Sequence, residues 1–103
     1  MNITATNVES ENKVVLVLEG RLDSITAPTL QQAIAEPISA AQNVDLDFMD
    51  LKYVSSAGLR VLLIGEKSAK NKDVKMRIIN VSDGIMEVFK LTGFSKVLNV
   101  VGV

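Results

Sequence analysis

The sequence of 103 residues contains no cysteine, no histidine and no tryptophan. The lack of cysteine excludes disulfides and thiolate chemistry and fits a cytoplasmic protein. The lack of histidine excludes a Ser-His-Asp triad, histidine phosphotransfer and any zinc site built with histidine. Only hard cations bound by carboxylates remain to be considered. Asp45 and Asp47 alternate with apolar residues and are typical of a solvated strand face, so we expect neither a metal site nor a cofactor.

Long apolar runs and an excess of charge of one sign are also missing. The formal net charge is −1, with scattered lysines, which argues against a nucleic-acid partner. No apolar run has the length of a membrane span, and the first residues, MNITATNVESENK, lack the pattern of a signal peptide. With 48% hydrophobic residues, residues 1–103 are expected to form one domain around one core, without inserting into a membrane.

The hydrophobic pattern alternates between the period of strands and that of helices. This pattern predicts an α/β fold of order β-β-α-β-α-β-α-β, with a mixed sheet of four to five strands and about three helices. The first two strands are close enough for a hairpin, and the later strands are joined by helices and so expected to be parallel. The expected strands are residues 3–8, 13–19, 44–48, 74–79 and a short final one, and the expected helices follow residue 26, span about 56–69 and end at residue 91.

Several local signals refine these boundaries. Residues 20–26 are expected to form a loop in which Ser24 or Thr26 caps the first helix. Pro37 lacks an amide hydrogen, so this helix is expected to end or kink at about Glu36. Residues 13–19 are apolar on both faces and predict a central strand, whereas a short link is expected after residue 48.

The candidate site is the segment Ser55-Ser56-Ala57-Gly58, where a strand leads into a helix. The first amides of a helix have no acceptor within it, and its dipole favours negative charge there. A serine at this point can be a helix cap, an anion-binding hydroxyl or a phosphorylation site. Because the preceding strands are expected to be parallel neighbours, residues 23–26 and 55–58 are expected to lie at one end of the domain.

Three segments carry a resemblance to a known family: GRLDSITAPTL, LDFMDLKYVSSAGLRVLL and IMEVFKLTGFSKVLNV. Together they resemble the STAS domain, in the form of stand-alone bacterial anti-sigma-factor antagonists. This resemblance implies a monomeric, non-enzymatic switch protein. Such a protein binds an anti-sigma factor that is also a serine kinase, is released when that kinase phosphorylates it, and is reset by a PP2C-type phosphatase.

The resemblance also implies roles for individual residues. The phosphoacceptor position falls on Ser56, with Ser55 as second choice, and the loop aspartate of the family falls on Asp23. Ser55 departs from the family, which usually has aspartate there. The implied partner interface consists of Asp23, Ser24, Ser55, Ala57, Gly58 and Leu59.

Two other functions are open at this point. The first is a STAS subunit of a membrane transporter complex in lipid trafficking, which the missing aspartate before the acceptor favours. The second is a module that binds a small nucleotide or anion at the helix N-terminus, although no phosphate-binding glycine loop is present. Gly58 is expected either to let a partner approach the backbone or to serve close packing.

Overall fold

A five-stranded mixed sheet with strand order β1-β2-β3-β4-β5 forms the frame of the protein. The structure is a computed structural model and describes residues 1–102. β1 pairs with β2 antiparallel, and the other neighbours are parallel, so the predicted element order is confirmed. The strands are β1 (Asn2–Val8), β2 (Lys13–Leu22), β3 (Asn43–Val54), β4 (Met76–Val81) and β5 (Asn99–Gly102), and the helices are α1 (Ala27–Ser39), α2 (Ser56–Asn71) and α3 (Asp83–Thr92).

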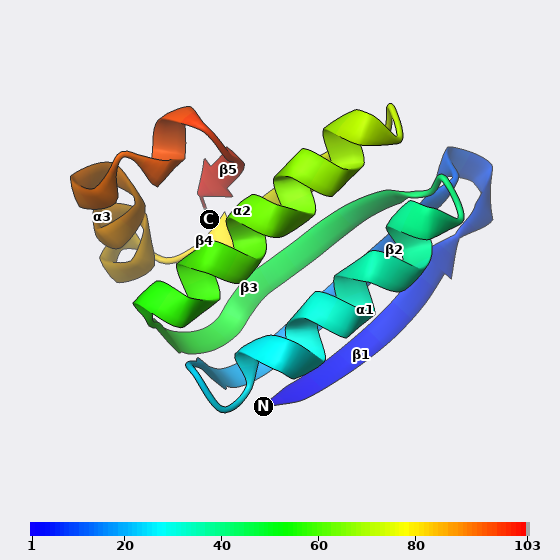
Figure 1. Ribbon diagram of the computed structural model, residues 1–103. Coiled ribbons are helices and arrows are strands. Elements are labelled where there is room, and N and C mark those ends of the chain that lie inside the picture. The colour runs from blue at the N-terminus through cyan, green and yellow to red at the C-terminus, as the bar shows by residue number, and fades with distance from the viewer. Residues whose placement is uncertain (103) are drawn as a thin grey trace.

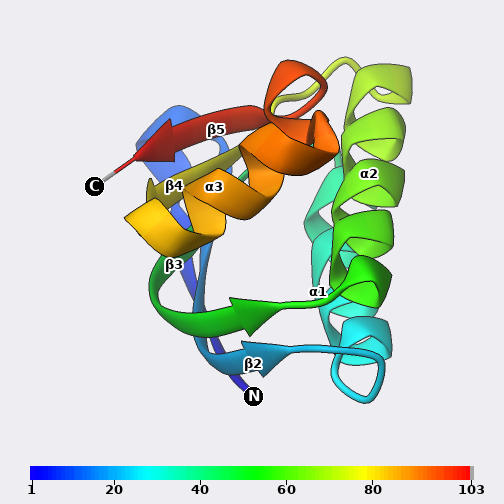
Figure 2. The same ribbon diagram turned by 90° about the vertical axis from the view of Figure 1, so that its left-hand side faces the viewer.

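Helices α1 and α2 lie side by side on one face of the sheet (Figure 1). The view turned by 90° shows these two helices and the sheet as two layers (Figure 2). Apolar side chains that alternate along β2, β3 and β4 point into the core between them, including Leu16, Leu46 and Ile78. Helix α3 contributes Phe89 to the core, and the ring centroid of Phe89 lies 6.3 Å from that of Phe48 in the middle of β3.

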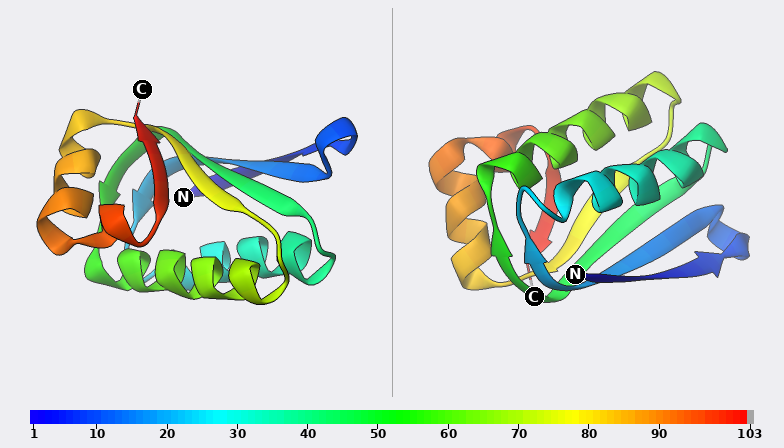
Figure 3. Two further views of the ribbon diagram at one scale, coloured as in Figure 1. Left: turned by 90° about the horizontal axis from the view of Figure 1, so that it is seen from above. Right: turned by 60° about the horizontal axis from the view of Figure 1, so that its bottom comes forward.

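Within residues 1–102, the opposite face of the sheet carries no helix (Figure 3). β2 was predicted to be central and lies between β1 and β3, so it is an internal strand, but the central strand of the sheet is β3. Val15 and Val17 are half-buried on the open face, which explains why β2 is apolar on both faces. These valines share this face with charged residues of the neighbouring strands.

On the open face, Asp45 is only 3% exposed, so the prediction of a solvated aspartate was wrong. Arg77 donates two hydrogen bonds to the Asp45 carboxylate, at 2.9 and 2.7 Å, and Lys13 Nζ lies 3.0 Å from Oδ2. The aliphatic stems of the two cations allow them to cover the carboxylate while their charged ends stay near water. Burial raises the pKa of Asp45, but hydrogen bonds from Arg77 and Lys13 outweigh this effect and hold the pKa below its ordinary value.

β2 and β3 are both longer than predicted. Arg21 pairs with Tyr53 and Leu22 with Val54, so the expected link after residue 48 is strand, and the loop shortens to residues 23–26. Gly20, which suggested the start of a loop, has φ of +105° at a register shift inside the strand. Glycine adopts this conformation without steric cost, so it bends the strand rather than ending it.

Helix α1 was predicted to end or kink at about Glu36, and it continues to Ser39, so the predicted end was three residues too early. Pro37 lies in the last turn and has no amide hydrogen, so the hydrogen bond that residue 37 would donate to the Ala33 carbonyl oxygen is missing. The amide of Ala40 still donates to the carbonyl oxygens of Glu36 and Pro37, at 3.3 and 3.1 Å.

Candidate functional site

The end of β2 and the start of α2 are held together by one backbone hydrogen bond. The Ser55 amide donates to the Leu22 carbonyl oxygen at 2.8 Å, one residue beyond the last β2–β3 pair. Asp23 follows Leu22 directly and Ser56 follows Ser55, so the two predicted loops share one end of the domain. Figure 1 shows this end, where the loop before α1 lies beside the first turn of α2.

The two adjacent serines have different surroundings. Ser55 is the N-cap of α2: its backbone is extended and its Oγ accepts a hydrogen bond from the Gly58 amide at 3.3 Å. Ser56 is the first residue of the helix and its side chain is exposed. The hydroxyl of Ser55 is therefore engaged in capping, whereas that of Ser56 faces solvent at the positive end of the helix dipole.

Gly58 and Leu59 do not form the surface that was predicted for them. A Cβ on Gly58 would lie 2.6 Å from Cγ of Leu22, so the missing side chain lets α2 pack against β2. Leu59 is 6% exposed and belongs to the core, and Ala57 is half-buried against it. The buried Gly58 and Leu59 fix the position of Ser56 at the start of α2, whereas Ala57 stays a predicted interface residue.

Asp23 organises the loop before α1. Its Oδ1 accepts hydrogen bonds from the amides of Ile25 and Thr26, at 3.0 and 3.1 Å. The backbone hydrogen bond from Thr26 is the largest cause that lowers the pKa of Asp23. The carboxylate thus stays charged near the first turn of α2 while it holds the loop in one shape.

The expected capping of α1 by Ser24 or Thr26 was wrong. Thr26 occupies the N-cap position, but its side chain makes no capping hydrogen bond to the helix. Its hydroxyl instead donates to the Arg21 carbonyl oxygen at 2.9 Å, and Ser24 is exposed. Asp23 accepts the hydrogen bonds of the free amides before the helix. Sequence propensity alone assigns this role to any of several neighbouring polar residues.

Three residues at this end were missed in the sequence. Ile25 is 84% exposed at the tip of the loop, and Tyr53 is 42% exposed at the end of β3. The Arg21 guanidinium lies 4.2 Å from the Tyr53 ring centroid and 3.9 Å from the Asp23 carboxylate. Two features of the sequence could have indicated these surface residues. They are the single tyrosine, three residues before Ser56, and an isoleucine in a polar loop.

Ser24, Ile25, Tyr53 and Ser56 are all exposed at this end of the domain. Four hollows of the structure, of about 420, 120, 290 and 320 Å³, are lined by other residues. Exposed apolar and aromatic side chains beside a modifiable hydroxyl are suited to contact with a protein. Within residues 1–102, no helix is long and apolar enough to cross a membrane.

The family model described as "Mlab, STAS domain" matches residues 5–101. The chain therefore belongs to the STAS domain family, and the resemblance noted in the sequence is confirmed. It is 23% identical to the anti-sigma-B factor antagonist of Bacillus subtilis over 100 residues, which cover 97% of this chain and 92% of that protein. It is 26% identical to the protein of the same name from Listeria monocytogenes, over 97% of this chain and 90% of the relative.

Solved structures show the same fold. An anti-sigma factor antagonist from Mycobacterium paratuberculosis matches with a TM-score of 0.86 and 18% identity, over 99% of this chain and 86% of the other. The anti-sigma factor antagonist SpoIIAA in its unphosphorylated form matches with a TM-score of 0.72 and 20% identity, over 86% and 82% of the two chains. The phosphorylated form of SpoIIAA from Bacillus also gives 0.72, with 18% identity over 96% and 90%.

Proposed function

We propose that this protein is an anti-sigma-factor antagonist that works by partner switching. In the unphosphorylated form it binds an anti-sigma factor that is also a serine kinase, and phosphorylation of Ser56 releases it. The observation that carries the proposal is the exposed Ser56 side chain at the start of α2, next to the loop that Asp23 organises. Relatives named as anti-sigma-B factor antagonists, matched over nearly the whole chain, support it.

The proposed switch acts through charge. A phosphate on Ser56 adds about −1.5 to −2 charges at the surface that meets the partner. The helix dipole favours negative charge at this position, so the domain is expected to stay folded. In a docked complex the same charge loses its water, and Asp23 adds repulsion toward an acidic partner. Each loss of ~1.4 kcal/mol weakens binding tenfold, so one modification is enough to separate the complex.

The protein itself needs no catalytic group in this scheme. The kinase transfers the phosphate from ATP to Ser56, and a PP2C-type phosphatase removes it. The antagonist contributes an acceptor hydroxyl, a docking surface and no cofactor. We therefore propose a cytoplasmic, non-enzymatic regulator.

The test is a calorimetric titration of the protein with the purified anti-sigma kinase of its own host. The unmodified chain is expected to bind, and Ser56→Asp is expected to bind at least tenfold more weakly. Ser10→Asp is the matched control, because Ser10 is exposed in the turn after β1, far along the chain from the site. Equal binding of all three proteins, or none by the unmodified chain, would contradict the proposal.

A second candidate is a STAS subunit that stays docked on a membrane transporter. It is favoured by Ser55, which occupies the position where antagonists usually carry aspartate and which here caps α2. This function predicts stable co-purification with a permease complex and no release when the protein is phosphorylated. The same Ser56→Asp variant separates the two candidates, since a permanent subunit would remain bound.

A further inference from the structure

A line of exposed residues runs along α2 from the proposed phosphorylation site. Ser56, Arg60, Ile64 and Lys67 are all exposed and follow one another at intervals of three or four residues. Residues at this spacing lie on one side of a helix. Two cations and an isoleucine that is 39% exposed therefore extend the surface around Ser56 along the helix.

A groove between α1 and α2 accompanies this line. Two hollows of about 120 and 320 Å³ share Ala35, Ile38 and Ser68 as lining residues, so they adjoin each other along the groove. Gly65 lets the helices come close, because a Cβ there would lie 3.1 Å from Cγ2 of Ile34. Figure 1 shows the two helices running side by side on the face of the molecule that carries the groove.

The exposed surface of α2 carries charge of one sign. Its exposed charged residues are all positive, and Lys72, at the C-cap, lines the end of the groove. The single acidic residue of the helix, Glu66, has a side chain that is 12% exposed and lies 4.0 Å from Lys70. The whole chain carries a net charge of −1, so this positive surface is not a consequence of composition.

We infer that the groove between α1 and α2 binds an acidic amphipathic helix of the anti-sigma partner. Its apolar side would pack against Ile64 and Ala35, and its carboxylates would face Arg60 and Lys67. The inference rests on the proposed function, because Ile64, which lines the groove, lies in the line of exposed residues that starts at Ser56 and so extends that docking surface. An anionic membrane is a poorer match, since a flat surface leaves a groove between two helices unfilled.

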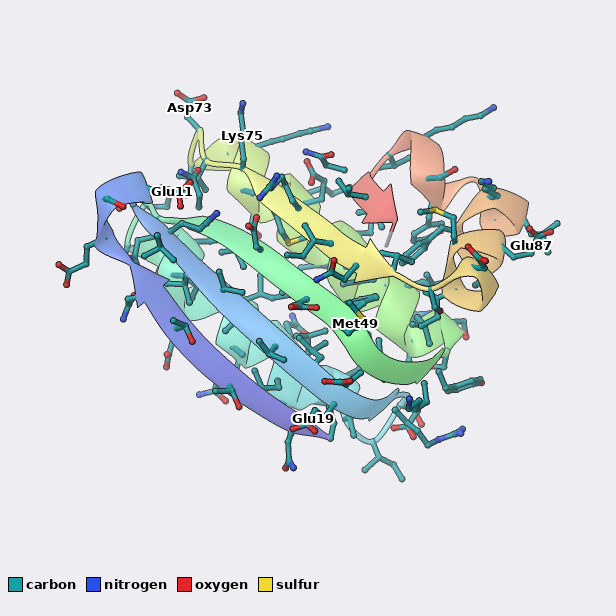
Figure 4. The ribbon with its side chains drawn as sticks, turned by 180° about the vertical axis from the view of Figure 1, so that it is seen from behind. Glu11, Glu19, Met49, Asp73, Lys75 and Glu87 are labelled. Carbon is teal, nitrogen blue, oxygen red and sulfur yellow. The ribbon has the colours of Figure 1, made fainter. Side chains whose placement is uncertain are left out.

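Two pairs of variants test the groove by titration against the host's anti-sigma kinase. Lys67→Glu is expected to weaken binding about tenfold, because it places a carboxylate against an acidic partner. Lys75→Glu makes the same charge change beside Asp45 and Arg77 on the open sheet face and is expected to change binding less than twofold (Figure 4). Ala35→Trp fills the groove and is expected to weaken binding more than tenfold. Gln32→Trp, on an exposed position of α1 that does not line the groove, is its control.

The outcomes separate the two proposals. If Ser56→Asp abolishes binding while Lys67→Glu and Ala35→Trp bind like the unmodified chain, the groove inference is overturned and the proposed function stands. If the unmodified chain does not bind the kinase, the proposed function fails and the groove inference falls with it. Vesicles of phosphatidylglycerol and phosphatidylethanolamine serve as the competing probe. Sedimentation of the protein with them that is lost in Lys67→Glu would also overturn the groove inference, in favour of a lipid surface.

Discussion

The Ser55 amide donates a hydrogen bond of 2.8 Å to the carbonyl oxygen of Leu22. This contact joins the end of β2 to the N-cap of α2 and sets Asp23 and Ser56 on neighbouring backbone segments. The loop with the aspartate and the helix with the acceptor hydroxyl therefore form one connected surface. Changes that disturb this junction should alter docking even when they leave the surface side chains unchanged.

Gly58→Ala tests the close approach of α2 to β2. The added Cβ would lie 2.6 Å from Cγ of Leu22, and Leu22 is fully buried, so the helix start has to shift. We expect a loss of ~1–3 kcal/mol in the free energy of unfolding, measured with urea. Gly84→Ala is the control, because no atom lies within 4 Å of its Cβ position, and it should be neutral or slightly stabilising. Equal effects of the two substitutions would show that the packing of Gly58 is unimportant.

Ser55→Ala separates capping from phosphorylation. Loss of the hydrogen bond from the Gly58 amide to Ser55 Oγ should lower the free energy of unfolding by ~1 kcal/mol. Ser56→Ala removes an exposed hydroxyl and should leave stability almost unchanged. Thermal unfolding of both variants checks the prediction, and a larger loss in Ser56→Ala would reverse the assigned roles.

Asp23→Ala should loosen the loop that precedes α1. The carboxylate accepts hydrogen bonds from the amides of Ile25 and Thr26, and alanine cannot replace them. We expect faster hydrogen exchange of these two amides by NMR and weaker binding of the partner. Asp23→Asn keeps an acceptor oxygen and should restore most of the protection. Unchanged exchange in Asp23→Ala would mean that the loop is held by other contacts.

Asp45 should make the free energy of unfolding depend on pH in the acid range. Its folded-state pKa lies below the ordinary value of 3.8, so its contribution is complete above that pH and is lost as the pH falls through the folded pKa. Asp45→Asn should cost ~1–3 kcal/mol at neutral pH, since Lys13 and Arg77 lose a shared carboxylate yet keep some contact with water. Urea unfolding at pH 7 and pH 3 should show a smaller difference between variant and unmodified protein at pH 3. Asp50→Asn, at an exposed position of β3, should show no such convergence.

The order of the elements could be predicted because each carries its own hydrophobic period. The meeting of the two loops could also be predicted, since the ends of parallel neighbouring strands lie together. The continuation of β2 beyond Gly20 could not, because a glycine inside a bent strand has the same local signature as a turn. The continuation of β3 to Val54 depends on that same pairing and was missed for the same reason.

The roles of single polar residues were harder to predict than the fold. Asp45 is buried by Arg77 and Lys13, which lie 32 positions away along the chain in both directions. Nothing near Asp45 in the sequence reveals these partners. Likewise, Gly58 could be predicted as either a contact or a packing residue, and only the position of Leu22 decides between them.

The most direct test of the partner-switching account is to incubate the protein with ATP and the host's anti-sigma kinase and to map phosphate by mass spectrometry. The account predicts one phosphate, on Ser56, in the unmodified chain and in Ser55→Ala, and none in Ser56→Ala. Phosphate on Ser55 in the Ser56→Ala variant, or no phosphate on the unmodified chain, would contradict it.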